Sequence, residues 1–152
     1  MLNNIITKYL SRKRGRLFVA FIDFRKAFDY VDRRKLLLYL HSKGLRGNLF
    51  YMLSSLFDSL QSCVRVNNNL SGMFPCLRGL QQGSPLSPLL FNLFIDSISD
   101  EMCSLTSYGI QLDDTTLTHL LYADDLVLFS YWIPGLQKLL DGLSRFSKSV
   151  SF

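Results

Sequence analysis

The stretch LLYADDLVLFS, residues 120–130, places two adjacent carboxylates, Asp124 and Asp125, between two apolar runs. Apolar runs on both sides of a short polar turn predict a β-hairpin with strands at 117–121 and 126–129. Two carboxylates that are packed together repel each other, so the pair is favourable only if it is solvated or holds a cation. Aspartate is also common in ordinary turns, so an ordinary turn remains the alternative for this pair taken alone.

A third carboxylate occupies a similar position earlier in the chain. The run LFVAFID, residues 17–23, predicts a buried strand that ends at Asp23. Asp23 lies beside the Asp124–Asp125 turn if the two strand elements are neighbours in one sheet. A site made of carboxylates without histidine or cysteine suits Mg²⁺ better than zinc. His41 and His119 lie in no ligand pattern, and we expect structural or surface roles for both.

The segment between these carboxylates predicts helices and a second hairpin. Asp32 is a candidate N-cap for a helix that ends near Gly44, and a second helix is expected from about Asn48 to Asp58. Residues 62–78 predict a hairpin with an Asn67–Asn69 turn. The expected inward-facing side chains of the two helices are Leu36, Leu37 and Leu40, then Leu49, Met52, Leu53, Leu56 and Phe57.

The second half of the chain begins with a glycine loop. Gly83 breaks the chain, Ser87 is a candidate cap and Pro88 suits a first helical position. A loop is expected at 112–115, and a last helix is expected to start near Leu136. This order predicts an α+β fold, with an antiparallel sheet backed by helices in a single domain covering residues 1–152.

Composition limits the class of protein. The 152 residues are 48% hydrophobic and 13% aromatic, which supplies a packed core and argues against disorder. The net charge of +5 indicates a polyanionic partner, although solvated basic faces are an equal alternative. Much of the excess charge lies in Lys8, Arg12, Lys13, Arg14 and Arg16, and in Arg25, Lys26, Arg33, Arg34 and Lys35.

The cysteines and the apolar runs give an expectation for the cellular location of the protein. The three cysteines form no Cys-x-x-Cys pair, so we expect reduced thiols and an intracellular protein of the nucleus or cytoplasm. No signal peptide or membrane span is expected.

Three segments together resemble a known family. FIDFRKAFDYV, GLQQGSPLSPLLFNLFI and YADDLVLFS, in this order, resemble the central palm motifs of reverse transcriptases, with the nearest likeness to non-LTR (LINE-type) retrotransposons. The resemblance implies a palm-like antiparallel sheet with incomplete fingers and no thumb. It further implies an RNA-directed DNA polymerase that uses two Mg²⁺ ions, or Mn²⁺, to add deoxynucleoside triphosphates to a primer 3′-hydroxyl.

The resemblance implies a role for each matching residue. Asp23 and Asp124 match the metal-binding aspartates, and Asp125 matches a less direct third acid. Phe28 matches the aromatic that lies beneath the incoming sugar and excludes a 2′-hydroxyl, although a core aromatic is the alternative. Gln82 and Gly83 match the loop that shapes the nucleotide pocket, and an ordinary loop-to-helix entry is its alternative.

Further positions follow from the same resemblance. Phe24 follows the first aspartate, whose main-chain neighbour contributes to the nucleotide site. Tyr122 and Ala123 match positions near the primer end. Arg25 and Lys26 lie near phosphates or in solvent.

The remaining acidic residues are not assigned to the metal site, and two positions depart from the family pattern. Asp29 and Asp32 are expected to cap helices, and Asp113–Asp114 is expected in a surface loop. Family members usually carry arginine and cysteine where this chain has Gln81 and Ser84.

The expected partners are an RNA template, a DNA primer and deoxynucleotides, with no membrane. We expect the 152 residues to be inactive alone because surfaces that clamp primer and template are missing. Two alternatives remain: a retroelement remnant that acts as a nucleic-acid-binding or interaction module, and a maturase- or telomere-type palm.

Overall fold

The computed structural model describes residues 2–11 and 16–150, which form two compact units. One unit comprises the described residues up to Arg25 together with Ile95–Val150, and we call it the sheet unit. The other comprises Lys26–Phe94, and we call it the helix–hairpin unit. The expectation that all 152 residues form one domain stays a prediction.

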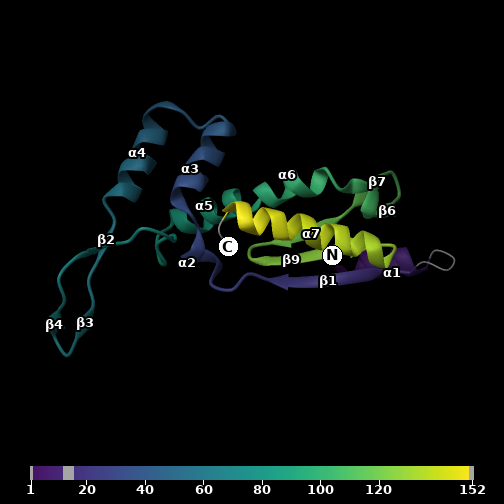
Figure 1. Ribbon diagram of the computed structural model, residues 1–152, viewed down its shortest axis with the longest axis horizontal. Coiled ribbons are helices and arrows are strands. Elements are labelled where there is room, and N and C mark those ends of the chain that lie inside the picture. Colours follow the sequence, from purple (N-terminus) through teal and green to yellow (C-terminus); the bar gives the residue numbers. More distant parts are fainter. Residues whose placement is uncertain (1, 12–15, 151–152) are drawn as a thin grey trace. The chain divides into compact units, whose positions relative to one another are not determined.

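The sheet unit is built on a three-stranded antiparallel sheet with the order β1-β9-β8 (Figure 1). These strands are β1 (Phe18–Asp23), β8 (His119–Tyr122) and β9 (Asp125–Ser130). The β1–β9 register runs from Phe18 opposite Ser130 to Asp23 opposite Asp125. The strand predicted at 17–23 and the hairpin around the Asp124–Asp125 turn are therefore both present.

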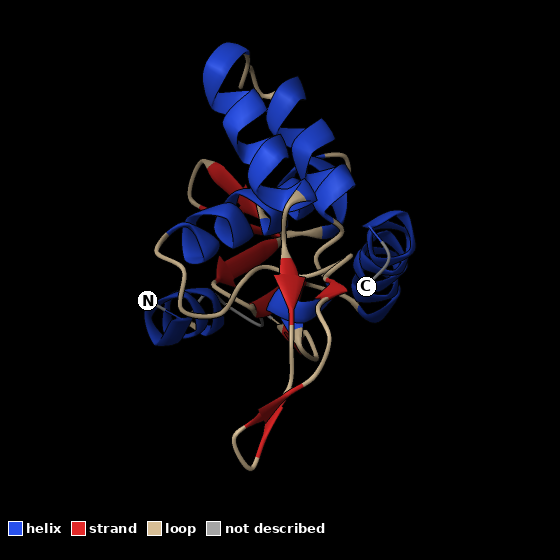
Figure 2. Cartoon of the chain, turned by 90° about the vertical axis from the view of Figure 1, so that its left-hand side faces the viewer, coloured by secondary structure: helices blue, strands red, loops and turns tan. Residues whose placement is uncertain are grey.

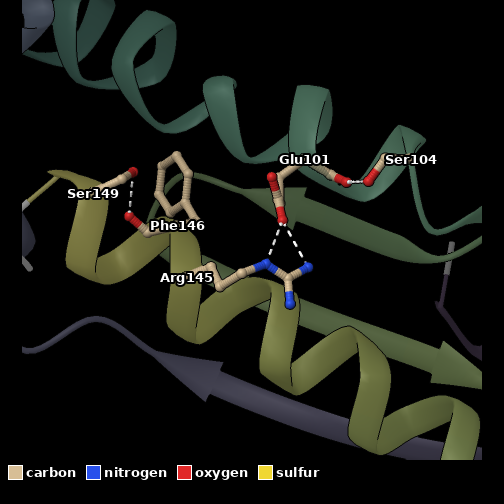
Figure 3. A network of polar contacts seen from close by, with 5 residues as sticks. All are labelled: Glu101, Ser104, Arg145, Phe146 and Ser149. Atoms are coloured by element: carbon tan, nitrogen blue, oxygen red, sulfur yellow. Dashed lines mark hydrogen bonds and ion pairs between the residues drawn. The ribbon is translucent and has the colours of Figure 1, made fainter.

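Two helices belong to the same unit, α6 (Ser97–Cys103) and α7 (Ile133–Val150). Helix α7 contacts both β1 and β9, and Leu126 and Leu128 of β9 are almost fully buried. Arg145 of α7 donates from Nε and Nη2 to Glu101 Oε1 of α6, at 3.2 and 2.9 Å (Figure 3). The apolar alternation of β9 thus places one sheet face against the helices.

The start of α7 differs from the sequence-based expectation. We expected the helix near Leu136, but it begins at Ile133, so Pro134 lies in its first turn. Proline is tolerated there because first-turn amides have no partner within the helix. The predicted start near Leu136 was therefore three residues too late.

The remaining elements of the sheet unit are short. They are α1 (Leu2–Leu10), η1 (Thr106–Tyr108), β6 (Ile110–Leu112) and β7 (Thr115–Leu117). The loop expected at 112–115 is the tight turn of the β6–β7 hairpin, with Asp113 at a positive φ of 52°. Asp113 is exposed, as expected, and forms an ion pair with Lys8 of α1.

The helix–hairpin unit contains α2 (Ala27–Tyr30), α3 (Arg33–Ser42), α4 (Gly47–Asp58) and most of α5 (Leu86–Ile95). Helices α3 and α4 lie side by side (Figures 1 and 2). The Asp32 carboxylate accepts from the backbone amides of Arg34 and Lys35 at 3.0 and 3.2 Å. Gly44 follows α3 with a φ of +100°, so both predicted ends of this helix are confirmed.

The predicted inward face of α4 is only partly correct. Leu53 and Phe57 are buried at 8% exposure each, but Leu49, Met52 and Leu56 are exposed at 55%, 67% and 42%. Burial is thus confined to one narrow i, i+4 stripe. The broader apolar pattern in the sequence overstated how much of this helix is covered.

The predicted second hairpin is present as two short ladders. β2 (Gln61–Ser62) pairs with β5 (Phe74–Pro75), and β3 (Arg65–Val66) pairs with β4 (Asn69–Leu70). Asn67 and Asn68 have positive φ values of 45° and 66°, as a type I′ turn requires. Asn69 therefore belongs to β4 rather than to the turn. The β3–β4 tip extends away from the helices of its own unit (Figures 1 and 2).

The entry to α5 also differs from the prediction. The helix begins at Leu86, so Ser87 and Pro88 lie inside its first turn. The Ser84 hydroxyl accepts from the Leu86 amide at 3.4 Å, while the buried Ser87 hydroxyl donates to the Gln81 carbonyl at 2.6 Å. The Ser87 hydroxyl therefore bonds to the preceding loop and does not cap the helix.

Within residues 2–11 and 16–150, no helix has the length and apolar content that a membrane span requires.

Candidate active site

Backbone pairing brings three aspartates to one end of the sheet, and we call Asp23, Asp124 and Asp125 the carboxylate edge. Asp23 of β1 lies directly opposite Asp125 of β9. Directly opposed residues in an antiparallel pair have Cα atoms about 4.5–5.5 Å apart and side chains on the same face. Asp124 immediately precedes Asp125 in the β8–β9 turn. The proximity that the sequence prediction required is therefore present in the backbone.

The β8–β9 turn has a strained residue. Tyr122 pairs with Asp125, so Ala123 and Asp124 are the two loop residues. Ala123 has a φ of +53°, a region that costs a non-glycine residue about 1 kcal/mol or more. Tyr122 is 83% exposed beside the turn. The sequence predicted the turn but gave no sign of this conformation, because alanine rarely adopts it.

Within residues 2–11 and 16–150, the side chains of the carboxylate edge have no cationic partner. Among the described residues, none of the three aspartate side chains makes an ion pair or a hydrogen bond. Asp23 and Asp125 are exposed, and Asp124 is half-buried. Like charges at directly opposed ladder positions are destabilising, and a divalent cation bound between them would relieve the repulsion.

The side chains themselves are not gathered around one point. In the described part of the chain, no group of three or more His, Cys, Asp or Glu side chains is placed to hold a metal ion. The donor type fits Mg²⁺, and the backbone brings the donors together, but metal binding requires their side chains to turn toward a common centre.

The carboxylate edge opens on the sheet face away from α7. Phe21 lies two residues before Asp23 on β1, on the same face, and is 68% exposed. Leu126 is buried on the other face. This end of β1 therefore carries an exposed aromatic beside Asp23.

A second group of predicted residues comes together in the helix–hairpin unit. The Leu80 amide donates to the Phe28 carbonyl at 2.9 Å, and Gln82 Nε2 donates to Asp29 Oδ1 at 3.2 Å. Phe28 is half-buried and stacks on Phe91 with ring centroids 4.4 Å apart. Phe28 thus has a core partner, as the alternative reading expected, and also lies beside the Gln82 loop.

Gly83 and two neighbouring acids also have defined surroundings. Gly83 has a φ of +87° and open space around its α-carbon. Asp32 caps α3 as expected, but Asp29 lies inside α2, whose N-cap is Lys26. The capping prediction for Asp29 was therefore wrong, because its carboxylate accepts from Gln82 instead of from a helix amide.

Arg33 is the residue that sequence reasoning placed incorrectly. We counted it in a basic cluster open to a polyanion, but it is 7% exposed. It donates to the backbone carbonyls of Phe57, Cys76, Arg78 and Gly79. Burial lowers the pKa of its guanidinium, and the nearby Cys76 acts in the opposite direction. No local pattern marked this burial, since its neighbours Arg34 and Lys35 are also basic.

The remaining predicted residues lie at the start of the segment that follows Asp23. Phe24 is half-buried, while Arg25 and Lys26 are exposed. Lys26 adopts a positive φ of 53°. These positions are compatible with contact to phosphates, and their roles stay predictions.

The sequence comparison now decides the family. Residues 2–152 match the family described as "Reverse transcriptase (RNA-dependent DNA polymerase)". The chain belongs to the reverse transcriptase family. The resemblance inferred from the three motifs is confirmed, and so is the α+β fold predicted from the order of the elements.

Relatives of this reverse transcriptase family member are retrotransposon polyproteins. It is 32% identical over 121 residues to the "Retrovirus-related Pol polyprotein from type-1 retrotransposable element R2" of Nasonia vitripennis, which covers 80% of this chain. It is 33% identical over 129 residues to the Popillia japonica protein of the same description, which covers 82% of this chain. The chain spans 12% and 18% of these two relatives.

A solved structure shares the fold. The "Structure of apo telomerase from Candida Tropicalis truncated from C-terminal domain" superposes with a TM-score of 0.72 at 16% identity. The match covers 97% of this chain and 31% of the telomerase chain. At this identity, the likeness supports the reverse transcriptase fold alone.

Proposed function

We propose that this chain is the palm-containing part of an RNA-directed DNA polymerase of the R2 retrotransposon type. It would extend a DNA primer on an RNA template with deoxynucleoside triphosphates. The observation that carries the proposal is the direct pairing of Asp23 with Asp125, with Asp124 in the adjoining turn. Family membership and the shared fold support it independently.

In this proposal, the carboxylate edge holds two Mg²⁺ ions, for which Mn²⁺ can substitute. Asp23 and Asp124 are the principal ligands, and Asp125 assists. When bound, the ions would activate the primer 3′-hydroxyl and neutralise charge on the triphosphate. The oxygen-only donor set and the lack of a competing cation within the described residues favour this assignment.

The protein's own groups then select and orient the substrates. Phe28 lies beneath the deoxyribose and excludes a 2′-hydroxyl, and the Gln82–Gly83 loop borders the same nucleotide. The Leu80–Phe28 and Gln82–Asp29 hydrogen bonds support the position of this loop beside Phe28.

The primer and template require contacts outside this pocket. The exposed Tyr122 and Ala123 lie at the primer end, and Phe24, Arg25 and Lys26 border the triphosphate. Lys and Arg outnumber Asp and Glu within Lys26–Phe94, whereas the rest of the chain carries equal numbers of basic and acidic residues. This excess supports contact between the helix–hairpin unit and a phosphate backbone.

We further propose that the 152 residues do not extend a primer efficiently alone. Precise positioning of reactants supplies many kcal/mol of catalysis, and a palm without clamping surfaces lacks it. Robust extension of a DNA primer on an RNA template by this chain, lost in Asp124→Asn, would overturn this proposal.

The function itself is tested by nucleotide binding. Equilibrium dialysis with dATP is expected to show binding that requires Mg²⁺ and is lost in Asp23→Asn and Asp124→Asn. Asp114→Asn is the matched control, because Asp114 belongs to another acidic pair in a hairpin turn but has no opposing aspartate. Binding that is independent of Mg²⁺, or equal loss in Asp114→Asn, would contradict the proposal.

The basic excess within Lys26–Phe94 also suits a second function, a nucleic-acid-binding module without catalysis. Such a module would lose RNA affinity steeply as salt rises and would be indifferent to Mg²⁺ and nucleotide. Filter binding across a salt series, with and without Mg²⁺ and dATP, separates the two functions.

A further inference from the structure

A buried arginine organises the loop that leads to the predicted nucleotide pocket. Arg33 Nε donates to the Gly79 carbonyl at 2.6 Å, and Nη2 donates to the Arg78 carbonyl at 3.2 Å. Nη1 donates to the carbonyls of Cys76 and Phe57. The guanidinium therefore holds three backbone positions within a stretch of four residues, 76–79, and joins them to the end of α4.

The anchored stretch continues directly into the pocket loop. The Gly79 amide donates to the Val31 carbonyl at 2.9 Å, and the Leu80 amide donates to the Phe28 carbonyl at 2.9 Å. A Cβ at Gly79 would lie only 2.8 Å from the Asp29 carbonyl oxygen. The segment thus packs against α2 at close range, two to four residues before Gln82 and Gly83.

The chemistry of this contact requires an arginine. The planar guanidinium presents donors in a fixed fork, whereas lysine offers a single ammonium that cannot span separated carbonyls in the same way. Arg33 has no carboxylate partner among the described residues, and its guanidinium lies 5.6 Å from the Phe57 ring centroid. A buried charge without a counter-ion costs free energy, so packing alone does not explain it.

We propose that Arg33 is a positioning residue for nucleotide binding. Its fork fixes residues 76–79 so that Gln82 and Gly83 stay beside Phe28. This inference rests on the proposed function, in which Phe28 and the Gln82–Gly83 loop line the deoxynucleotide pocket. The buried guanidinium keeps the loop in this conformation. Its replacement weakens nucleotide binding although the protein still folds.

The test uses Arg33→Lys, with Arg34→Lys as the matched control. Both variants keep the charge on the same helix, but Arg34 is exposed and its side chain makes no hydrogen bond to the described residues of the loop. Arg33→Met is the second variant, because it removes the buried charge and keeps a side chain that can pack in the same space. Each protein is measured for cooperative thermal unfolding, for dATP binding with Mg²⁺, and for hydrogen exchange at the Gly79 and Leu80 amides.

The hydrogen-exchange measurement does not depend on nucleotide. We expect exchange at Gly79 and Leu80 to be at least tenfold faster in Arg33→Lys, while amides within α4 keep their protection. We expect dATP affinity to fall about tenfold in the same variant, because the loop that borders the nucleotide loses hydrogen bonds that hold it in place. Arg34→Lys should match the wild type in both measurements.

The outcomes separate the two proposals. Failure of the wild type to bind dATP with Mg²⁺ contradicts the proposed function and, with it, this role of Arg33. Normal wild-type binding with unchanged exchange in a folded Arg33→Lys overturns the inference alone. Faster exchange with unchanged dATP affinity also overturns it. Loss of cooperative unfolding in both Arg33 variants shows a purely structural role and equally overturns it.

Discussion

Asp23 and Asp125 are direct cross-strand partners, and this pairing places two carboxylates at the end of one ladder. The pairing is fixed by backbone hydrogen bonds along the whole of β1 and β9, from Phe18 opposite Ser130 onward. The two aspartates therefore keep opposed positions although like charges at such positions are destabilising. Proteins commonly accept such local repulsion where a site has to bind a cation.

Removal of one charge from this pair should stabilise the metal-free protein. Like charges directly opposite each other in a sheet are destabilising, so Asp125→Asn should raise the free energy of unfolding by about 0.2–1 kcal/mol without Mg²⁺. Chemical denaturation measures the change. Asp114→Asn, on the β6–β7 turn, controls for a general effect of net charge. A lower free energy of unfolding in Asp125→Asn would show that the pair does not repel.

The turn beside this pair carries its own strain. Glycine at position 123 accepts a φ of +53° without steric cost, but it has more conformational entropy to lose on folding. We expect Ala123→Gly to raise the free energy of unfolding by up to about 1 kcal/mol. Ala20→Gly in β1 is the control and should lower it. If Ala123→Gly lowers the free energy of unfolding as much as Ala20→Gly does, the backbone at Ala123 is not strained.

Gly79 should not tolerate a side chain. It has a φ of +82°, and a Cβ would meet the Asp29 carbonyl oxygen. Gly79→Ala is expected to lower the free energy of unfolding by about 2 kcal/mol and to weaken dATP binding. Gly72 has open space around it, so Gly72→Ala is the matched control and should change neither quantity. A wild-type melting temperature in Gly79→Ala would contradict the packing described here.

Stability should also fall in acid because of His119. Burial lowers the pKa of its imidazole, and the nearby Asp96 opposes this effect. The unfolded chain then binds a proton more readily than the folded one, so stability decreases as pH falls below about 6.5. Above that pH, the residue contributes no slope. The imidazole lies within hydrogen-bond distance of the hydroxyls of Ser99 and Thr118, at 3.0 and 2.9 Å.

Unfolding curves between pH 5 and 8 measure this slope. His119→Gln should remove part of the loss of stability between about pH 6.5 and pH 5. His41→Gln is the control because His41 lies on the exposed surface of α3. An identical slope in the wild type and His119→Gln would exclude this source of acid sensitivity.

The sequence predicted the sheet and the carboxylate edge because strong local patterns encode them. The apolar runs before Asp23 and after Asp125 have the length and composition of strands, and the short turn at residues 122–125 between two apolar runs indicates a hairpin. Asp32 and Gly44 marked the ends of α3 correctly, since caps act through their immediate neighbours.

The sequence did not predict features that depend on distant contacts. Arg33 has the same local neighbours whether it faces solvent or four carbonyls from distant positions. The apolar residues of α4 lie on more than one side of the helix. Tertiary packing, which the local sequence does not show, buries only Leu53 and Phe57 among those predicted to face inward. The β6–β7 hairpin was missed because its strands are three residues each, too short for a periodic signal.

The most direct measurement of the central claim is paramagnetic broadening by Mn²⁺ in backbone amide spectra. The account predicts that substoichiometric Mn²⁺ broadens the amides around Asp23 and those of the Tyr122–Asp125 turn first. Mg²⁺ should reverse the effect, and Asp23→Asn should abolish it. Equal broadening at Asp113 and Asp114, or broadening that survives Asp23→Asn unchanged, would contradict a metal site shared by the two strands.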